Sequence, residues 1–537
     1  MKQVSRSAHV DTFTRENLPP RALWPEFLFT LPELEYSASL NCAAELLDRH
    51  VESGAGARRC LVSETEQWSY ADLLARSNQV AHALVHELGL VPGNRVLLRG
   101  PNNPWLVASW FGVIKAGGVA VTTMPLLRSG ELETMVDIAS VTMAICDHRF
   151  SKDLDTAAPD GFQIFTYGDD TPDDLTKVAA SKRPTFKNVA TAADDVCMLA
   201  FTSGTTGKPK ATMHFHRDVL AIADTFARHV LRPTRDDLFA ASPPLAFTFG
   251  LGQNVVFPLR SGAAVYLIEQ PSPQRLLEAV ERHGITVLAT APTAYRAMLP
   301  DLSSANLTSL RACVSAGETL PQATWEAVHE ACGVRIIDGI GSTEMLHIFI
   351  SAAGDEIRPG STGRAVPGYV AEVQDPDGRP APDGELGRLA VKGPTGCRYL
   401  RGDRQATYVQ NGWNVTGDVY VRDGDGYFKY QARADDMIIS AGYNIAGPEV
   451  EEALLRHPAV AEAAVVGLPD AERGMIVKAV VVLRPDADLG AEPAGTLQDF
   501  VKSQIAPYKY PRAIEFADEL PRTATGKLQR FRLREGS

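Results

Sequence analysis

Residues 202–210, with the sequence TSGTTGKPK, combine small residues, hydroxyl groups and lysines in a pattern that suits phosphate binding. Small residues let backbone N–H groups approach anionic oxygens, while hydroxyls and a lysine add further hydrogen-bond donors. A Walker A loop is excluded, because it needs four residues between its glycines and then Lys followed by Ser or Thr. Here two residues separate Gly204 from Gly207, and Pro209 follows Lys208. The alternative interpretation is a mobile polar surface turn.

The segments on either side of this loop predict a strand-to-strand connection. Residues 194–201 are a short apolar run of strand length, and residues 210–216 alternate in polarity. A helical pattern starts only near Arg217. The loop therefore lacks the helix N-terminus whose dipole assists a Walker loop, and would bind phosphate with turn amides and side chains alone.

The sequence before the loop predicts a parallel sheet covered by helices. A capping box at Ser69 and Asp72, followed by apolar residues at helical spacing, predicts a helix over 68–89. The next segments have the patterns of a strand, a helix and a strand, which together make a βαβ unit: 95–102, 104–118 and 119–125.

Alternating strand and helix patterns continue from residue 264 to residue 344. From about residue 360 the pattern changes to short strands with turns, which indicates an antiparallel β subdomain. The last hundred or so residues have a compact α+β pattern of their own. We therefore predict an α/β protein, with helix-covered sheets and an antiparallel β subdomain in a large N-terminal domain, and a small α+β C-terminal domain.

Size and composition limit the function classes. A chain of 537 residues exceeds one hydrophobic core, so two or more domains are expected. The net charge of −12 argues against nucleic acid or an anionic membrane as a partner. The N-terminus lacks the apolar run of a signal peptide, so we expect a cytoplasmic protein. Seven scattered cysteines suggest neither disulfides nor a zinc knot. A metal pair at His214 and His216 is disfavoured because no third ligand lies nearby in sequence.

Further clusters of glycine and polar residues lie at predicted strand ends, where ligand sites of α/β folds gather. They are SAGE (315–318), DGIGSTE (338–344), TGD (416–418), QARADDMIISAGYNI (431–445) and PRTATGKLQR (521–530). Together with residues 202–210, they resemble the ordered core motifs of the adenylate-forming superfamily, which includes acyl- and aryl-CoA synthetases, peptide-synthetase adenylation domains and beetle luciferases. The resemblance runs from roughly residue 30 to the C-terminus. It implies ATP, Mg²⁺ and coenzyme A as cofactor and co-substrates.

The resemblance implies a role for each motif in adenylating a carboxylic acid. The loop would hold the β- and γ-phosphates of ATP through Thr202, Ser203, Gly204, Thr205, Thr206, Gly207 and Lys208. Thr343 would contact the α-phosphate, and Glu344 would hold Mg²⁺. Ala211 stands where the family usually has Gly, a departure that affects the following strand more than the loop.

The nucleoside of ATP would be bound by the later motifs. Asp418 and Arg433 would bind the ribose hydroxyls. Adenine would be lined by Gly317, Glu318, Asp338, Gly339 and Ile340. Many relatives have Tyr at the position of Ile340, so an aliphatic side chain would cover the base here.

The resemblance also implies a moving small domain. Asp435 falls at the hinge position of the family, which divides the chain into residues 1–434, the large adenylation domain, and residues 435–537, the small rotating domain. Lys527 would bridge the carboxylate of the acid and the α-phosphate. Gly442 would line the tunnel for the pantetheine arm of CoA after the domain rotates.

The acid is expected to be small and aromatic. The acid-binding region of the superfamily includes Ala246, Phe247, Ala316, Gly341 and His347, and many fatty-acyl relatives have His at the position of Phe247. The motif DGIGSTEMLHIF resembles the benzoate-CoA ligase group, while the N-terminal stretch is more similar to its 2-aminobenzoate (anthranilate) branch. We therefore expect 2-aminobenzoate first and benzoate second. Phe247, Phe249 and His347 are equally typical of a buried core.

Two further hypotheses remain open at this point. A stand-alone enzyme that loads aryl groups onto a carrier protein would have the same motifs, and a nucleotide-binding protein of this fold could lack ligase chemistry. The complete set of motifs disfavours the second of these. The oligomeric state is either monomer or homodimer.

Overall fold

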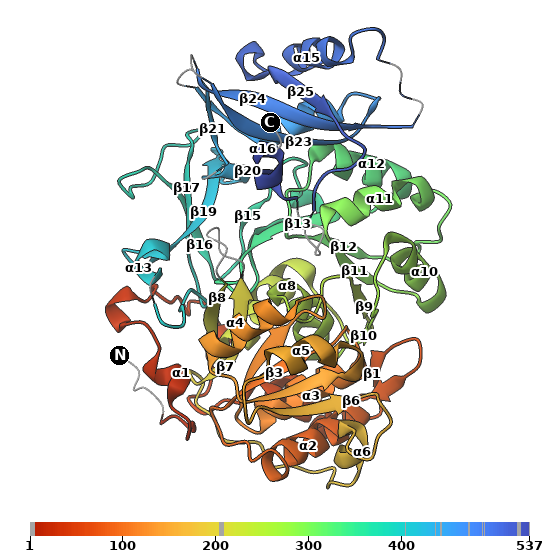
Figure 1. Ribbon diagram of the computed structural model, residues 1–537, viewed down its shortest axis with the longest axis vertical. Helices are drawn as coiled ribbons and strands as arrows, with labels where there is room; N and C mark the ends of the chain where they lie inside the picture. The colour runs from red at the N-terminus through yellow and green to blue at the C-terminus, as the bar shows by residue number, and fades with distance from the viewer. Residues whose placement is uncertain are drawn as a thin grey trace.

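The computed structural model describes residues 6–202, 209–402, 404–434, 436–440, 443–470, 473–485, 487, 489–522 and 528–535. Within these ranges the chain forms four β-sheets with helices packed against them (Figure 1). Every helix in the same ranges is too short or too polar to cross a lipid bilayer.

The sheet that carries the phosphate loop has six strands in the order β6-β5-β3-β4-β7-β8. They are β3 (Arg95–Arg99), β4 (Val119–Thr123), β5 (Met143–Asp147), β6 (Gln163–Tyr167), β7 (Val196–Thr202) and β8 (Lys210–Phe215). All neighbours pair in parallel except β7 and β8, which are antiparallel and directly flank residues 203–209. The predicted strand-to-strand loop is therefore confirmed. Helix α7 (His216–Ile222) then begins one residue before Arg217.

Helices cover this sheet as the sequence predicts. They are α2 (Tyr70–His86), α3 (Pro104–Lys115), α4 (Ser129–Ala139), α5 (Ser151–Ala157) and α6 (Leu175–Ala180). The capping box that starts α2 is present, since the Asp72 N–H donates to Ser69 Oγ at 3.1 Å and the Ser69 N–H donates to Asp72 Oδ2 at 3.0 Å. Helix α3 connects the parallel strands β3 and β4, which confirms the βαβ unit.

A second sheet has nine strands in the order β15-β14-β13-β12-β11-β9-β10-β1-β2. They are β1 (Arg59–Val62), β2 (Gln67–Ser69), β9 (Leu238–Ala241), β10 (Ala264–Tyr266), β11 (Val287–Thr290), β12 (Ala312–Ser315), β13 (Ile336–Gly341), β14 (Ile348–Ser351) and β15 (Arg364–Ala365). Strands β9 to β13 are parallel, so their carboxyl ends meet at one edge of the sheet. Strands β13, β14 and β15 extend it as an antiparallel meander.

The helices around the second sheet include three that the sequence patterns did not predict. They are α8 (Thr248–Leu251), α9 (Phe257–Ser261), α10 (Pro273–His283), α11 (Pro292–Leu302) and α12 (Gln322–Cys332), with π-helical turns in η6 (Ala223–Leu231) and η7 (Gly252–Val256). The unpredicted helices are α8, α9 and α11, of which α11 is the longest. Helix α11 begins with Pro292 at its first turn, a position that proline suits because that N–H has no intrahelical partner.

The remaining two sheets agree with the predicted change of pattern near residue 360. An antiparallel sheet contains β16 (Val370–Gln374), β17 (Gly387–Lys392), β18 (Val409–Gln410), β19 (Trp413–Arg422) and β20 (Phe428–Arg433). The last sheet contains β21 (Ile438–Ser440), β22 (Tyr443–Ile445), β23 (Val460–Asp470), β24 (Gly474–Leu483) and β25 (Ala513–Phe516). It packs with α14 (Gly447–Leu455), α15 (Pro493–Gln504) and α16 (Arg530–Glu535), and lies at the top of Figure 1.

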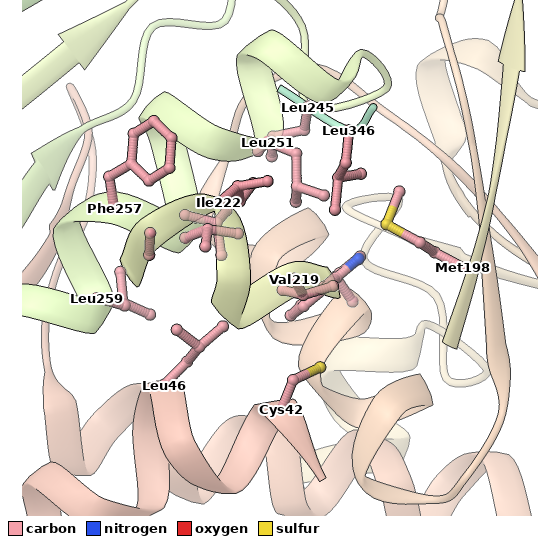
Figure 2. Close-up of a cluster of buried hydrophobic side chains, with 14 of the residues drawn as sticks. Cys42, Leu46, Met198, Val219, Ile222, Leu245, Leu251, Phe257, Leu259 and Leu346 are labelled. Atoms are coloured by element: carbon pink, nitrogen blue, oxygen red, sulfur yellow. The ribbon is translucent and has the colours of Figure 1, made fainter. Parts of the chain in front are cut away.

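A continuous hydrophobic core joins the elements that carry the candidate site. Figure 2 shows Leu245, which precedes α8, lying close to Leu251 of α8 and to Leu346, which precedes β14. Met198 of β7 and Phe257 of α9 belong to the same buried cluster. This packing fixes the turn before β14 relative to the strand that leads into the phosphate loop.

Candidate active site

The base of the phosphate loop lies beside Glu344. Thr202 and Lys210 are paired across β7 and β8, so the loop leaves and returns at one point. The Lys210 ammonium lies 5.7 Å from the centre of the Tyr399 ring, and the Tyr399 hydroxyl donates to Glu344 Oε1 at 2.6 Å. The structure therefore brings together two motifs that are more than a hundred residues apart. The loop residues Ser203, Gly204, Thr205, Thr206, Gly207 and Lys208 lie outside the described residues.

Tyr399 reaches this position because its segment pairs with the free edge of β8. The Met213 N–H donates to the Arg398 carbonyl at 2.8 Å, and Thr212 lies opposite Tyr399 in an antiparallel bridge. Arg398 is fully buried and forms an ion pair with Asp218, which anchors the segment. The sequence analysis missed Tyr399, because a tyrosine in an irregular segment shows no periodic signal.

The buried Tyr399 and the half-buried Tyr408 connect Glu344 to the ribose motif. The Tyr399 and Tyr408 rings lie 5.9 Å apart, and the Tyr408 hydroxyl lies 3.3 Å from Ser342 Oγ. Burial, and then the negative charge of Glu344, raise the pKa of both tyrosines, and Asp418 adds to the rise for Tyr408. Both phenols therefore stay protonated and can donate hydrogen bonds.

Asp418 and Arg433 face each other across two neighbouring strands. They are register partners on β19 and β20, with Asp418 Oδ1 and Arg433 Nη1 3.7 Å apart. Gly417 leaves room for this arrangement, because a Cβ there would lie 2.6 Å from Arg433 Nη2. Burial raises the pKa of Tyr420, and the charges of Asp418 and Asp338 add to the rise, so both carboxylates are near this ring. The ribose and adenine motifs are thus adjacent.

Asp338 retains some exposure as a residue, but its Oδ1 atom is sealed from solvent and has no hydrogen-bond partner among the described residues. Burial raises the pKa of this carboxyl to about 7, with Ser315 and the Gly339 backbone opposing part of the rise. Gly317 has a φ of +91° and no atom within 4 Å of where its Cβ would be. Ser315, the register partner of Asp338, lies two residues before this open space.

The remaining nucleotide residues occupy the same strand ends. Gly339 and Ile340 lie on β13, with Ile340 half-buried opposite Ile350 of β14. A Cβ at Gly339 would lie 2.7 Å from the Ile348 side chain, so the close strand packing excludes a larger residue. Glu318 follows Gly317 and lies 3.8 Å from Arg522 of the C-terminal part of the chain.

The expected acid-binding residues come from three parallel strand ends. Ala246 and Phe247 follow β9, Ala316 follows β12, and Gly341 ends β13. The Ala246 carbonyl accepts a hydrogen bond from Thr122 Oγ1 of β4 at 3.3 Å, which joins this turn to the first sheet. A Cβ at Gly341 would lie 2.6 Å from the carbonyl oxygen of His347, so this turn requires glycine.

His347 is buried among aromatic rings. Its ring centre lies 4.5 Å from Phe257, 5.4 Å from Phe226 and 5.7 Å from Phe249. Neither ring nitrogen makes a hydrogen bond of ordinary geometry with the described residues. Burial lowers the pKa of His347 to about 3, with the Phe249 backbone opposing part of the change. The imidazole is therefore neutral at physiological pH.

Phe249, rather than Phe247, is the residue of this turn that stacks near His347. Phe247 is half-buried at the start of α8, whereas Phe249 lies within the helix. Gln253 was also missed by the sequence analysis. It is fully buried, and both its Oε1 and Nε2 atoms lack hydrogen-bond partners among the described residues. The spacing of four residues from Phe249 was the available signal, because it places both side chains on one helical face.

The other sequence hypotheses have different outcomes. Lys527, Gly442 and the hinge residue Asp435 lie outside the described residues. All seven cysteines are free thiols. Among the described residues, one buried cluster of candidate metal ligands comprises Cys42, Cys197 and His216, so His214 and His216 do not form the metal pair considered above. His216 Nδ1 already accepts the Cys42 N–H at 3.2 Å, so a hydrogen-bonded cluster accounts for this geometry.

The chain matches two models of known protein families. The AMP-binding enzyme model matches residues 47–399, and the model of the AMP-binding enzyme C-terminal domain matches residues 449–527. The chain therefore belongs to the AMP-binding enzyme family.

Comparison with individual proteins shows which members of this family the chain resembles. A benzoate–CoA ligase from Thauera aromatica is 36% identical over 515 residues, which cover 94% of this chain and 98% of that protein. The structure of the anthranilate CoA ligase AuaEII in complex with anthranoyl-AMP has a TM-score of 0.89 at 34% identity, covering 94% of this chain and 99% of that one. The structure of a benzoate CoA ligase from Burkholderia xenovorans LB400 has a TM-score of 0.85 at 34% identity, covering 92% of this chain and 100% of that one.

These similarities confirm the predicted superfamily, the fold and the class of AMP-forming acid–thiol ligases. Within the family, the chain is similar to the benzoate–CoA ligase group, and its structure resembles that of an anthranilate CoA ligase. ATP and CoA as co-substrates agree with this membership.

Proposed function

We propose that this protein is an aryl-CoA ligase. It adenylates an aromatic carboxylate with ATP and releases pyrophosphate, then transfers the aryl group to CoA and releases AMP. The observation that carries the proposal is one continuous polar site, which runs from the base of the phosphate loop through Tyr399 and Glu344 to Asp418 and Arg433. The ring-lined His347 follows the same hairpin turn as Glu344, so the acid and the nucleotide would meet there.

The chemistry requires cations where anions converge. The carboxylate oxygen attacks the α-phosphorus, which brings the acid and the phosphates together, so positive charge at this point lowers the barrier. Lys527 would bridge the carboxylate and the α-phosphate, and Thr343 would contact the same phosphate. The Glu344 carboxylate suits Mg²⁺, which prefers oxygen ligands, and the Tyr399 hydroxyl holds that carboxylate in one orientation. When bound, Mg²⁺ would offset the charge of the phosphates.

The nucleoside would occupy the strand ends beyond Tyr408. Asp418 can accept hydrogen bonds from the ribose hydroxyls, and Arg433 can donate to them. The unpaired Oδ1 of Asp338 is an acceptor for an amino group such as that of adenine. Gly317, Glu318, Gly339 and Ile340 would line the base, with the open space over Gly317 admitting the ring.

We also propose that the chain divides at residue 435 into a large and a small domain. In support of this boundary, strand β20 of the antiparallel sheet ends at Arg433, and strand β21 of the last sheet begins at Ile438. Gly442 of the small domain would line the tunnel for the pantetheine arm of CoA. A cytoplasmic location remains a prediction.

For the acid we propose 2-aminobenzoate first and benzoate second. Aromatic rings around His347 suit a flat ring, and neutral imidazole offers one acceptor and one donor nitrogen. Buried polar atoms without partners are costly, so their presence here favours an acid whose substituent would satisfy them. A benzoate ring without substituents would leave these atoms unpaired.

Gln253 supports the same proposal, because it lies in the helical segment that packs against His347. Phe249, Gly252 and Phe257 all contact His347 or lie near it, and a Cβ at Gly252 would lie 2.5 Å from His347 Nε2. Gln253 lies on the same face at helical spacing. The next residue is held differently, since Asn254 Nδ2 donates to the Pro243 carbonyl at 3.1 Å.

The first test measures products and acid preference together. We expect AMP and pyrophosphate as products, with kcat/KM decreasing in the order 2-aminobenzoate, benzoate and decanoate, and with 2-hydroxybenzoate and hexanoate completing the panel. Stoichiometric ADP would contradict adenylation, and a preference for decanoate would contradict an aryl pocket. Product formation with a carrier protein but not with CoA would favour the carrier-loading alternative.

The second part of the test uses Gln253→Leu. The variant should lose about tenfold or more in kcat/KM for 2-aminobenzoate, because a missing hydrogen bond in such a pocket costs about 1–3 kcal/mol. Its kcat/KM for benzoate should change by less than about threefold. Gln67→Leu, at an exposed position on β2, is the matched control. Equal losses for both acids would contradict a role of Gln253 in reading the ring substituent.

A further inference from the structure

Four charged side chains meet where the C-terminal sheet packs on the nucleotide-binding part of the chain. Arg296 of α11 and Glu318 belong to the large part, whereas Glu462 of β23 and Arg522 belong to the small one. Figure 1 shows the C-terminal sheet above α11 and α12, and α14 contacts α12 directly. Each side of this contact thus contributes one arginine and one glutamate.

Arg522 connects the two sides. Its Nη2 lies 2.5 Å from Glu462 Oε2 within its own part of the chain, and its Nη1 lies 3.8 Å from Glu318 Oε1 across the contact. Arg296 reaches in the opposite direction, with Nη1 donating to the Ala461 carbonyl at 3.5 Å. Burial lowers the pKa of Arg296, while the charges of Glu462 and Glu318 oppose that change. The four groups are close enough to interact as one network.

The position of Arg522 in the chain connects this network to catalysis. Arg522 and Leu528 form an antiparallel bridge, and the Gln529 N–H donates to the Pro521 carbonyl at 2.8 Å. The described residues on either side of 523–527 are therefore held together. Lys527 directly precedes Leu528 in the sequence. Arg522 thus lies close in sequence to the proposed catalytic lysine. It also contacts Glu318, one of the proposed adenine-binding residues.

We propose that Arg522 is a positioning residue for the first half-reaction. Its bridge from Glu462 to Glu318 holds the small domain against the nucleotide-binding part in the orientation used for adenylation, and the bridge opens when the domain turns for thioester formation. The proposal rests on the aryl-CoA ligase function given above. Because the side chains are partly exposed, at 27% for Arg522 and 17% for Glu318, salt should weaken the bridge.

The test measures the two half-reactions separately. Adenylation is followed by acid-dependent exchange of pyrophosphate into ATP, and thioester formation by supplying synthetic 2-aminobenzoyl adenylate with CoA. Arg522→Ala should lower exchange by about tenfold and change thioester formation by less than twofold. Arg522→Lys should fall between the wild type and Arg522→Ala, because it keeps the charge but loses the fork geometry. Arg532→Ala, an exposed arginine on α16, is the matched control and should leave both rates unchanged.

Salt adds a readout that a purely structural role would not move, and hydrogen exchange tests the contact itself. Raising the salt concentration should slow exchange of pyrophosphate more in the wild type than in Arg522→Ala. Backbone amides of residues 292–302 should exchange with deuterium faster in Arg522→Ala than in Arg532→Ala, which needs no catalysis. Equal losses in both half-reactions, or no loss in either, would overturn the proposal. A wild-type protein inactive in both half-reactions would instead overturn the proposed function, while the deuterium comparison would still decide the role of Arg522.

Discussion

At the scale of single residues, the candidate site places three tyrosines near three carboxylates. Tyr399 and Tyr408 are near Glu344, and Tyr420 is near Asp418 and Asp338. Burial and the neighbouring negative charge keep the phenols protonated, so they donate hydrogen bonds rather than add charge. The Glu344 carboxylate is thereby oriented by the Tyr399 hydroxyl, whereas the hydroxyls of Tyr408 and Tyr420 lie near Ser342 Oγ and Thr362 Oγ1.

Removing one phenol tests this arrangement. Tyr399→Phe keeps the ring but loses the donor that lies 2.6 Å from Glu344 Oε1. Because partners of this kind orient metal ligands, we expect the Mg²⁺ concentration for half-maximal adenylation to rise about tenfold. Tyr427→Phe, whose hydroxyl donates to the Glu356 carbonyl, is the control. An unchanged Mg²⁺ dependence in Tyr399→Phe would remove Glu344 from the metal site.

The raised pKa of Asp338 predicts a pH effect on stability. The folded carboxyl titrates at about 7, above the usual value of 3.8, so the folded state binds this proton more tightly than the unfolded state does. The stabilisation of the folded state by this bound proton is fully present below about pH 4, and it is lost as pH rises through 7. Asp338→Asn mimics the protonated form. Its melting temperature relative to the wild type should therefore rise by several degrees between pH 5 and pH 8.

The exposed variant Asp377→Asn is the control for that measurement, because its side chain is 70% exposed. Its melting temperature relative to the wild type should stay constant over the same pH range. A constant difference for Asp338→Asn as well would show that this carboxyl is ionised in the folded protein at pH 5.

At the scale of elements, the site depends on how the turn before β14 fits against η7. Leu346 adopts a φ of +71°, which is unfavourable for a residue with a Cβ, yet it is fully buried among Leu245 and Leu251 (Figure 2). Packing therefore holds the strained turn. The neighbouring His347 then packs directly over Gly252.

Gly252→Ala tests this contact. The added Cβ would lie 2.5 Å from His347 Cδ2 and Nε2, so the ring or the helix must move. Overpacking of this kind costs about 1–3 kcal/mol. We expect a lower melting temperature and a loss of about tenfold or more in kcat/KM for aryl acids. Gly130→Ala in α4, where no atom lies within 4 Å of the Cβ position, should be neutral. Full activity in Gly252→Ala would show that the position of His347 is unimportant for the acid.

At the scale of the whole molecule, the proposed reaction requires one small domain to serve two half-reactions. The sheet of β21 to β25 packs with its own helices around a hydrophobic core that includes Val465, Val477 and Leu497. Such a unit can move as a body while its interior stays intact. Contacts such as the bridge of Arg522 to Glu318 would then decide which orientation is populated.

If one small domain serves both half-reactions in turn, two substitutions outside the described residues should each impair a different half-reaction. Lys527→Ala should reduce adenylation by on the order of 10²-fold, because a preorganised charge is removed, yet still convert a supplied aryl-adenylate to its thioester. Gly442→Leu should block thioester formation and leave exchange of pyrophosphate intact. The two half-reactions are measured as for Arg522. Loss of the same half-reaction in both variants would contradict a rotating domain.

The sequence by itself determined the elements and the motifs. The capping box of Ser69 and Asp72, the strands around residues 202–210 and the change of pattern near residue 360 all depend on local spacing, which a single chain segment carries. The resemblance of the ordered motifs indicated the superfamily for the same reason.

Tertiary structure alone decided which residues meet. Tyr399 acts on Glu344 because its segment pairs with the edge of β8, and Arg522 reaches Glu318 because the C-terminal sheet packs on the nucleotide-binding part. Gln253 and His347 differ from ordinary core residues because their polar atoms lack hydrogen-bond partners among the described residues. Whether a buried atom has such a partner depends on all of the residues packed around it. Such contacts join residues far apart in the chain, and no local pattern records them because packing, rather than spacing, creates them.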